Sequence, residues 1–454
     1  MLENLKVGFV CFGEVNTPYD IIERKYNQTK KLFEGASINI ITTAPVTDNP
    51  LKDDVKRAVK ELRTSPIDVL IVCLAGWIPS YTVIDVIEPF KNLPMILLGL
   101  NGWEEDGRKI TTADQAGTTA LRHPMEQMGY RFKYIVTRLG ESLPLQNILD
   151  FLQAIYTVKL LKGSKIGSMG YRDMRLYATL HEGISLKGKY GVEVDCFEML
   201  EIVEFMNSLE QQRIAEVKST MLNNWKFTNQ PQDITLEKTA KLFLAISDKI
   251  KKSNYKAITL IDVDGVKKFL KFAPAGAFML IGQENNIPTI PENDFMGSFT
   301  QLIVHYLTGQ IAAYLEFYEF SSEGAIMGVP DYIPSAITEG DITITPTAFG
   351  DFGEGLLNVS RIKTGEITLL RMALIDGQYC LHAINATGNP PPAWEEAGWK
   401  QPAPQLPGLY VKFHGDTEAF IQQVFGQHYI MAYGNILPLL KDFCYLTNTR
   451  LIAG

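Results

Sequence analysis

The sequence predicts an α/β protein with two successive parallel-sheet domains and a β-rich C-terminal domain. In the first third of the chain, apolar runs of strand length alternate with amphipathic helical patterns. This alternation is the pattern of parallel βαβ units with helices on both faces of a sheet. A second set of such units follows residue 163, and after residue 340 closely spaced strand-like runs with turn residues between them indicate an antiparallel sheet or small barrel.

Length and composition limit the number of domains and the class of protein. The 454 residues exceed what one simple core needs and allow two or three domains. Apolar residues make up 46% and charged residues 21%, as in ordinary globular proteins, and no apolar run is long enough to suggest a membrane span. The charged N-terminal stretch MLENLKVGFV argues against a signal peptide, and five scattered cysteines indicate reduced thiols. We therefore expect a cytoplasmic protein.

The charge pattern bears on the partner. The formal net charge is −8, and the sequence has no dense run of Lys and Arg interleaved with aromatic residues. Nucleic-acid-binding proteins usually carry such a basic footprint. We therefore expect a small-molecule partner, with neither nucleic acid nor membrane.

The predicted N-terminal α/β domain covers residues 1–162. GFVCFGEVNTP stands where a dinucleotide-binding GxGxxG motif would follow the first strand, so a dinucleotide site is not expected. The loop AGWIPSY follows the third strand, at the edge where such sheets bind ligands. Trp77 in this loop is a candidate for stacking on a sugar ring, and simple packing is the alternative. The expected strands are 6–12, 38–42, 69–74, 95–100 and 132–136.

The predicted central α/β domain covers residues 163–310, and the β-rich C-terminal domain covers residues 311–454. A segment with six prolines, 388–407, is expected to be a loop at the edge of the last domain. The expected strands of the central domain are 165–169, 192–197 and 257–263. Those of the last domain are 342–345, 356–362, 366–373, 378–386 and 408–413.

The candidate chemistry is concentrated in PENDFMGSFTQLIVHYLTGQIAAYLEFYEF, from residue 291 onward. Asn293 or Asp294 is expected to cap a helix that Gly309 ends. In the following strand, side chains alternate between the two faces, so Glu316 should share a face with Tyr314 while Glu319 points the opposite way. From the residues alone, capping and solvent exposure explain these carboxylates as well as ligand binding does.

Other catalytic motifs are missing from the sequence. It contains no GxSxG, no HExxH and no Walker-type loop. It has six histidines, and a single histidine is more often a hydrogen-bonded structural residue than a ligand. No histidine is therefore assigned a role by its identity alone.

The run PENDFMGSFTQLIVHYLTGQ, the later strand with a carboxylate, and GQHYIMAYGN near the C-terminus resemble the L-fucose/L-arabinose isomerase family. The resemblance covers nearly the whole chain at a low level, and the segments GYRDMRLYA and AGWIPSY are similar to loops that line the family's sugar site. It implies a metal-dependent aldose–ketose isomerase of carbohydrate metabolism, acting on a small or modified sugar through a cis-enediol(ate) intermediate. It also implies Mn²⁺ or Mg²⁺ as the cofactor and a homo-oligomer, either a trimer or a hexamer.

The same resemblance implies a site. It places the metal on Glu292, Glu316 and His428, and it makes the two glutamates the catalytic groups that transfer the proton. It gives Asp294 a supporting or capping role. The substrate-binding candidates are Trp77, Arg175, Tyr314 and Gln427, and Arg172 joins them if it reaches the site.

This sequence departs from the family pattern at two positions. Met327 lies in the region where arabinose-type enzymes add a histidine ligand, and Gln427 stands in place of the first of two paired histidines. Two alternatives are therefore kept. One is a sugar-binding or regulatory relative without turnover, and the other is metal-assisted aldol cleavage or epimerisation on the same scaffold.

Overall fold

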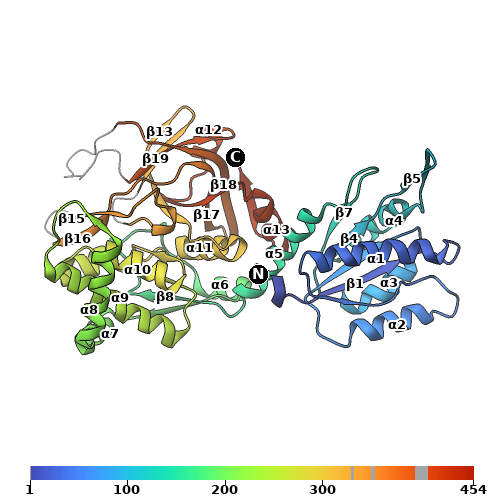
Figure 1. Cartoon of the computed structure of the whole chain (residues 1–454), viewed down its shortest axis with the longest axis horizontal. Coiled ribbons are helices and arrows are strands. Elements are labelled where there is room, and N and C mark those ends of the chain that lie inside the picture. Colours follow the sequence, from blue (N-terminus) through green and yellow to red (C-terminus); the bar gives the residue numbers. More distant parts are fainter. Residues whose placement is uncertain (1, 329–331, 349–352, 394–406) are drawn as a thin grey trace. The chain divides into compact units, whose positions relative to one another are not determined.

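The computed structural model describes residues 2–328, 332–348, 353–393 and 407–454 (Figure 1). The chain forms two compact units, Met1–Tyr156 and Thr157–Gly454, and each is described by itself. Most of the predicted proline-rich loop lies outside the described residues. In the ranges that are described, no helix combines the length and the apolar character needed to cross a membrane. The predicted domain boundaries after residues 162 and 310 stay predictions.

The first unit is built on a five-stranded parallel sheet in the order β2-β1-β3-β4-β7. The runs VGFVCF and VLIVCL form β1 and β3, and every residue in both is buried, as expected for strands covered on both faces. The strands are β1 (Val7–Phe12), β2 (Ile40–Thr42), β3 (Val69–Leu74), β4 (Met95–Gly99) and β7 (Phe132–Val136), and β5 (Trp103–Glu105) and β6 (Arg108–Ile110) form a hairpin after β4. The helices are α1 (Tyr19–Gly35), α2 (Asp53–Leu62), α3 (Ser80–Ile87), α4 (Asp114–Gln127) and α5 (Leu145–Leu161), which leads into the second unit.

The second unit begins with a four-stranded parallel sheet in the order β12-β11-β8-β9. Its strands are β8 (Lys165–Met169), β9 (Glu193–Phe197), β11 (Ala257–Leu260) and β12 (Thr289–Ile290). The surrounding helices are α6 (Gly183–Tyr190), α7 (Met199–Ser208), α8 (Gln211–Asn224), α9 (Asp233–Ser253), the π-helix η3 (Asp262–Leu270), α10 (Ala275–Asn285) and α11 (Phe295–Thr308). A small sheet of β10 (Lys226–Phe227), β15 (Thr343–Ala348) and β16 (Glu354–Asn358) lies beside them.

The rest of the second unit is a six-stranded antiparallel barrel. Its strand order is β17-β20-β13-β14-β19-β18, and pairing between β17 and β18 closes it. The strands are β13 (Ala313–Ser321), β14 (Gly324–Gly328), β17 (Gly365–Ile375), β18 (Gln378–Asn389), β19 (Gly408–Phe413) and β20 (His428–Tyr433), and β21 (Arg450–Ala453) adds to β18 in parallel. The helices α12 (Thr417–Ile421) and α13 (Leu437–Thr447) complete the unit.

The fold class predicted from the sequence is confirmed in its coarse form, which is parallel α/β sheets followed by an antiparallel barrel. Helix α11 connects the two parts of the second unit, because it packs against β11 of the parallel sheet and against β17 and β20 of the barrel (Figure 1). The buried contacts of α11 therefore bring the strand ends of the parallel sheet next to the outside of the barrel.

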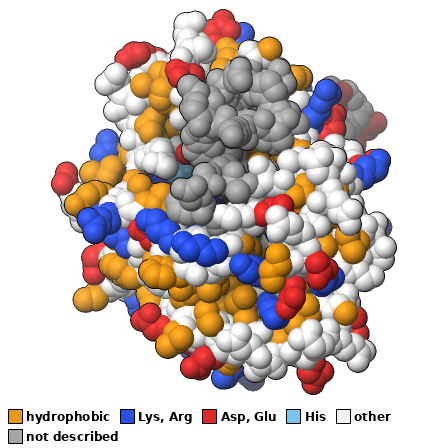
Figure 2. All heavy atoms as spheres, turned by 90° about the vertical axis from the view of Figure 1, so that its left-hand side faces the viewer, with side chains coloured by type: hydrophobic (Ala, Val, Ile, Leu, Met, Phe, Trp, Pro, Cys, Tyr) orange, Lys and Arg blue, Asp and Glu red, His pale blue; other side chains and the backbone are white. Residues whose placement is uncertain are grey.

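On the face of the molecule shown in Figure 2, acidic and basic side chains lie among apolar ones.

Candidate functional site

The candidate site begins at the carboxyl ends of β11 and β12, the edge where open parallel sheets place their ligands. Asp262 follows β11 and Glu292 follows β12. The backbone N–H of Glu292 donates to Asp262 Oδ1 at 2.7 Å, and this hydrogen bond joins the two loops. Both residues are buried.

The loop after β12 has an uncommon backbone. Glu292 and Asn293 have φ angles of 63° and 49°, in the left-handed region that non-glycine residues seldom occupy. The Asn293 side-chain amide donates to Ser168 Oγ and to the Met169 carbonyl, each at 3.0 Å, and its backbone N–H donates to the Leu260 carbonyl. These buried contacts hold the loop in this conformation and so set the direction of the Glu292 side chain.

Asp294 follows and begins α11. Its Oδ1 accepts a hydrogen bond from the N–H of Gly297 at 2.8 Å, and α11 ends at Gly309, which has a φ of 75°. The predicted cap at Asp294 and the predicted helix end at Gly309 are therefore confirmed. Capping uses only part of the hydrogen-bonding capacity of the carboxylate.

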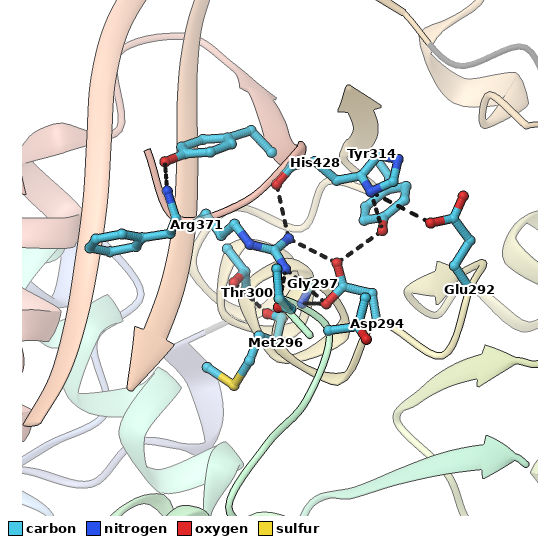
Figure 3. Close-up of polar contacts among 12 residues, drawn as sticks. Glu292, Asp294, Met296, Gly297, Thr300, Tyr314, Arg371 and His428 are labelled. Atoms are coloured by element: carbon cyan, nitrogen blue, oxygen red, sulfur yellow. Dashed lines mark hydrogen bonds and ion pairs between the residues drawn. The ribbon is translucent and has the colours of Figure 1, made fainter. Parts of the chain in front are cut away.

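The Asp294 carboxylate also pairs with Arg371 from β17. Its Nη1 and Nη2 donate to the two carboxylate oxygens at 2.8 and 3.1 Å, and both side chains are fully buried (Figure 3). Burial raises the pKa of Asp294, but the charge and hydrogen bonds of Arg371 outweigh burial and hold that pKa below its usual range. Arg371 also donates to the carbonyls of Ala178 and His428 at 2.8 and 2.9 Å. Asp294 is thus an ionised acceptor.

Sequence reasoning missed Arg371. Its signal was a single arginine in the otherwise apolar strand run ITLLRMALI. An arginine is rarely buried unless it is paired, so such a position predicts a buried partner. The sequence does not name that partner, which lies 77 positions away.

Tyr314 and His428 connect this ion pair to the outer face of the barrel. In the antiparallel pairing of β13 with β20, Glu316 lies opposite His428 and Tyr314 lies opposite Ile430, so these side chains share a face. The Tyr314 hydroxyl lies 2.9 Å from Asp294 Oδ2 and 2.8 Å from His428 Nδ1 (Figure 3). The tyrosine and imidazole rings also stack, with centroids 4.2 Å apart.

The hydrogen-bond partners of Tyr314 determine where the protons of Tyr314 and His428 lie. Burial raises the pKa of Tyr314 well above its usual range, and the neighbouring Asp294 and Glu292 charges add to this, so Tyr314 keeps its proton. The ionised Asp294 can only accept, so the Tyr314 hydroxyl donates to it. His428 Nδ1 must then donate to the Tyr314 oxygen. In the neutral imidazole this leaves Nε2 as an acceptor.

The two glutamates lie on different sides of the imidazole. Glu316 Oε2 is 3.3 Å from Nε2, whereas Glu292 Oε2 is 3.7 Å from Nδ1. The side-chain exposure rises from 3% for His428 to 11% for Glu292 and 26% for Glu316. The site is therefore closed at the imidazole and reaches solvent at Glu316.

The structure corrects two positional expectations on β13 and β14. A bulge shifts the register between Phe317 and Glu319, so Glu319 pairs with Ile326. Met327 lies in the barrel core, so the neighbouring Ile326 faces outward. Because Glu319 pairs with Ile326, it also lies on the outer face, with Glu316 rather than opposite to it. Met327 lies fully buried inside the barrel, so a side chain at this position faces away from the site.

Among the residues that the structure describes, three of the four substrate-binding candidates make no side-chain contact with Glu292, Glu316 or His428. Gln427 is exposed, and its backbone carbonyl accepts from the Phe317 N–H. Arg175 is exposed in the loop after β8, where Arg172 stacks on Tyr177 with 4.2 Å from Cζ to the ring centroid. Trp77, which is 40% exposed, belongs to the first unit. Tyr314 is the candidate that lies in the site.

The donor set does not fit the metal centre that the isomerase resemblance implied. One ion can bind only one imidazole nitrogen, yet Glu292 and Glu316 approach different nitrogens, and Nδ1 is already bonded to Tyr314. Among the residues that the structure describes, no group of three or more His, Cys, Asp or Glu side chains is arranged to hold a metal ion. The three predicted ligands therefore lie together without forming a three-ligand cage.

No protein-family model and no curated protein matches the chain. Among solved structures, it is similar to an ABC transporter solute-binding protein from Burkholderia multivorans, at 8% identity over 67% of this chain and 94% of that chain, with a TM-score of 0.19. It is also similar to a periplasmic solute-binding protein from Actinobacillus succinogenes with bound D-allose, at 11% identity over 73% and 95% of the two chains, with a TM-score of 0.17. The arabinose-binding component of a transporter from Shewanella sp. ANA-3 matches at 10% identity over 73% and 89%, with a TM-score of 0.18. TM-scores this low carry no argument about function.

These findings correct the resemblance drawn from sequence. No family model and no curated protein supports the isomerase assignment, and the donor set of the described residues does not form the implied metal centre. The predicted isomerase activity and the manganese-isomerase description are therefore wrong. The predictions of a cytoplasmic location and of a trimer or hexamer stay predictions.

Proposed function

We propose that the second unit binds a small polyhydroxylated molecule, such as a sugar, whose hydroxyl groups donate hydrogen bonds to Glu316 and His428. The supporting observation is the distance of 3.3 Å between Glu316 Oε2 and His428 Nε2. In the neutral imidazole with its proton on Nδ1, both of these atoms are acceptors, and two acceptors this close are stabilised by a donor placed between or beside them. Hydroxyl groups on adjacent carbons of a sugar supply such donors.

The surroundings support recognition of a neutral ligand. Glu292 adds a further carboxylate on the other side of the imidazole. The network from Arg371 through Asp294 and Tyr314 fixes the ring and its tautomer before a ligand arrives. Preorganisation of this kind lowers the entropic cost of binding.

Replacing Glu316 with glutamine is expected to weaken binding at least about tenfold, because an amide offers one acceptor oxygen and places a donor where the ligand hydroxyl also donates. His428→Asn should weaken binding comparably, because it removes Nε2. Titration calorimetry of the full chain with a panel of neutral pentoses, hexoses and polyols at mildly alkaline pH measures these changes.

Glu319→Gln is the matched control. Glu319 lies on the same strand, is exposed, and loses the same charge on substitution. The affinity of this variant for the sugar should therefore stay within about twofold of that of the unchanged chain. The proposal fails if no sugar or polyol binds the unchanged chain, or if Glu316→Gln binds as tightly as Glu319→Gln. Repeating the titration with a chelator and with added Mn²⁺ or Mg²⁺ tests the predicted cofactor. Binding that is lost with the chelator and restored by the ion would assign the donor role to a cation.

Catalysis is tested separately. The prediction that this chain is an enzyme requires that its bound ligand be converted. Any sugar that binds can be incubated with the protein in deuterated buffer and examined for deuterium incorporation and for cleavage products. A ligand that binds and is recovered unchanged would identify a binding protein.

A further inference from the structure

The first unit contains a cavity of about 890 Å³ that no part of the proposed function uses. It lies beyond the carboxyl ends of β4 and β7, where α1, the segment after β4 and the beginning of α5 form its walls. Small-molecule pockets commonly have volumes of about 300–1,000 Å³ and lie at this edge of open α/β sheets. All of its lining residues belong to the first unit, so the cavity is complete within that unit.

Thr137, which directly follows β7, forms part of the wall. The residue is 3% exposed, its N–H donates to the Gly99 carbonyl at 2.9 Å, and its carbonyl accepts from Gln115 Nε2 at 2.6 Å. Its hydroxyl oxygen is itself buried, so the hydroxyl is not open to the cavity. Main-chain hydrogen bonds therefore hold this part of the wall in place.

The charges around the cavity favour an anion. Lys25 is neutralised by the buried Asp114 at 2.6 Å, and Glu141 lies 3.8 Å from Arg138. Two further basic side chains, Arg24 and Lys31, line the wall and are exposed. The 17-residue helix α5 begins at the cavity with no acidic residue in its first turn, and a helix N-terminus attracts negative charge.

The remaining wall is apolar. Leu32, Leu100 and Leu143 line it together with the indole of Trp103. The guanidinium of Arg24 lies over that indole, with its Cζ 4.6 Å from the ring centroid. A cation held over an aromatic ring is positioned before a ligand binds. The wall thus combines an apolar surface with a fixed positive charge.

We propose that this cavity binds a small organic anion, with a carboxylate or phosphate group at Arg24 and Lys31 and an apolar or planar body against Trp103 and the leucines. This ligand differs in charge from the neutral polyol proposed for the second unit, and its binding does not depend on Glu316 or His428.

Titration calorimetry of the full chain with three probes tests the proposal. The probes are AMP, phenylacetate and inorganic phosphate, which separate a phosphate ester, a carboxylate and a bare anion. We expect AMP or phenylacetate to bind once per chain, at least about tenfold more tightly than inorganic phosphate, because only these two also cover apolar surface. Raising the salt concentration should weaken binding, because the charges are partly exposed.

Arg24→Gln separates a ligand-binding role from a structural one. The side chain is exposed, so the substitution should leave the melting temperature of the ligand-free chain nearly unchanged while weakening anion binding about tenfold. Arg122→Gln on the exposed part of α4 is its control. The proposal is overturned if none of the three anions binds, if Arg24→Gln binds normally, or if Arg122→Gln weakens binding as much as Arg24→Gln.

Discussion

Arg371→Met is expected to lower the free energy of unfolding by about 3–5 kcal/mol, the cost of leaving one partner of a buried ion pair without compensation. Arg371 and Asp294 are fully buried and share two hydrogen bonds of 2.8 and 3.1 Å. Without the guanidinium, the strongest interaction that opposes the effect of burial on the pKa of Asp294 is lost. Urea denaturation followed by circular dichroism measures the change.

Two further variants separate charge from packing. The double variant Arg371→Met with Asp294→Asn should recover much of the lost stability, because no buried charge remains and asparagine can still cap α11. Arg213→Met is the matched control, since Arg213 pairs with Asp248 at 2.9 Å with both side chains about 40% exposed. It should cost less than about 1 kcal/mol. An Arg371→Met chain as stable as Arg213→Met would contradict the role assigned to the buried pair.

The network also predicts a link between stability and binding. Because Asp294 orients Tyr314 and through it His428, Arg371→Met should weaken sugar binding even under conditions where the variant is fully folded. This effect distinguishes a positioning role from a purely structural one. Fluorescence or calorimetric titration well below the unfolding midpoint provides the readout.

The second large effect is a loss of stability at acidic pH, which we expect from His382. This residue lies in the barrel and is fully buried. Its ring stacks on Phe420 with centroids 4.3 Å apart, and Nδ1 lies 2.7 Å from the Tyr429 hydroxyl. Burial lowers the pKa of His382 from 6.5 to about 4. Between pH 6.5 and about 4, the unfolded chain binds a proton at His382 that the folded chain does not bind. The stability of the fold is therefore complete above pH 6.5, and this contribution is lost as the pH falls toward about 4.

This difference in pKa corresponds to a loss of about 2–3 kcal/mol across the interval. His382→Gln keeps an acceptor for Tyr429 but does not titrate, so its stability should depend less on pH between these limits. His414→Gln is the control, because His414 is exposed and lies 2.7 Å from Thr387 Oγ1 through Nε2. Denaturation midpoints measured across this pH range give both slopes. Equal slopes for His382→Gln and the unchanged chain would assign the pH dependence to other groups.

Much of the fold could be predicted because its signals are local. The run VLIVCL at 69–74 is apolar throughout, and such a strand is stable only when both of its faces are covered. The Asp294 cap and the glycine that ends α11 lie at the two ends of one helix, so the spacing of a single segment reveals both. The bulge in β13 could not be predicted in this way, since register depends on the partner strand, and one extra residue moved Glu319 to the other face.

Sequence similarity was least reliable for the chemistry. The quoted motifs correctly brought Glu292, Glu316 and His428 into one neighbourhood, but a motif does not specify which imidazole nitrogen each carboxylate approaches. That choice depends on two residues from different barrel strands. Tyr314 is hydrogen-bonded to His428 Nδ1, and Arg371 is paired with Asp294. The isomerase assignment failed for this reason, together with the absence of any matching family.

The sequence by itself determined the alternation of strands and helices, the cap at Asp294 and the acidic character of the loop after β12, because each depends on residues a few positions apart. Only the tertiary structure decided that Arg371 neutralises Asp294 and that His428 carries its proton on Nδ1. Hydrogen bonds between residues far apart in the chain form only when packing brings them within about 3 Å. The distance between Asp294 and Arg371 along the chain, 77 positions, shows why no local pattern could have predicted their contact.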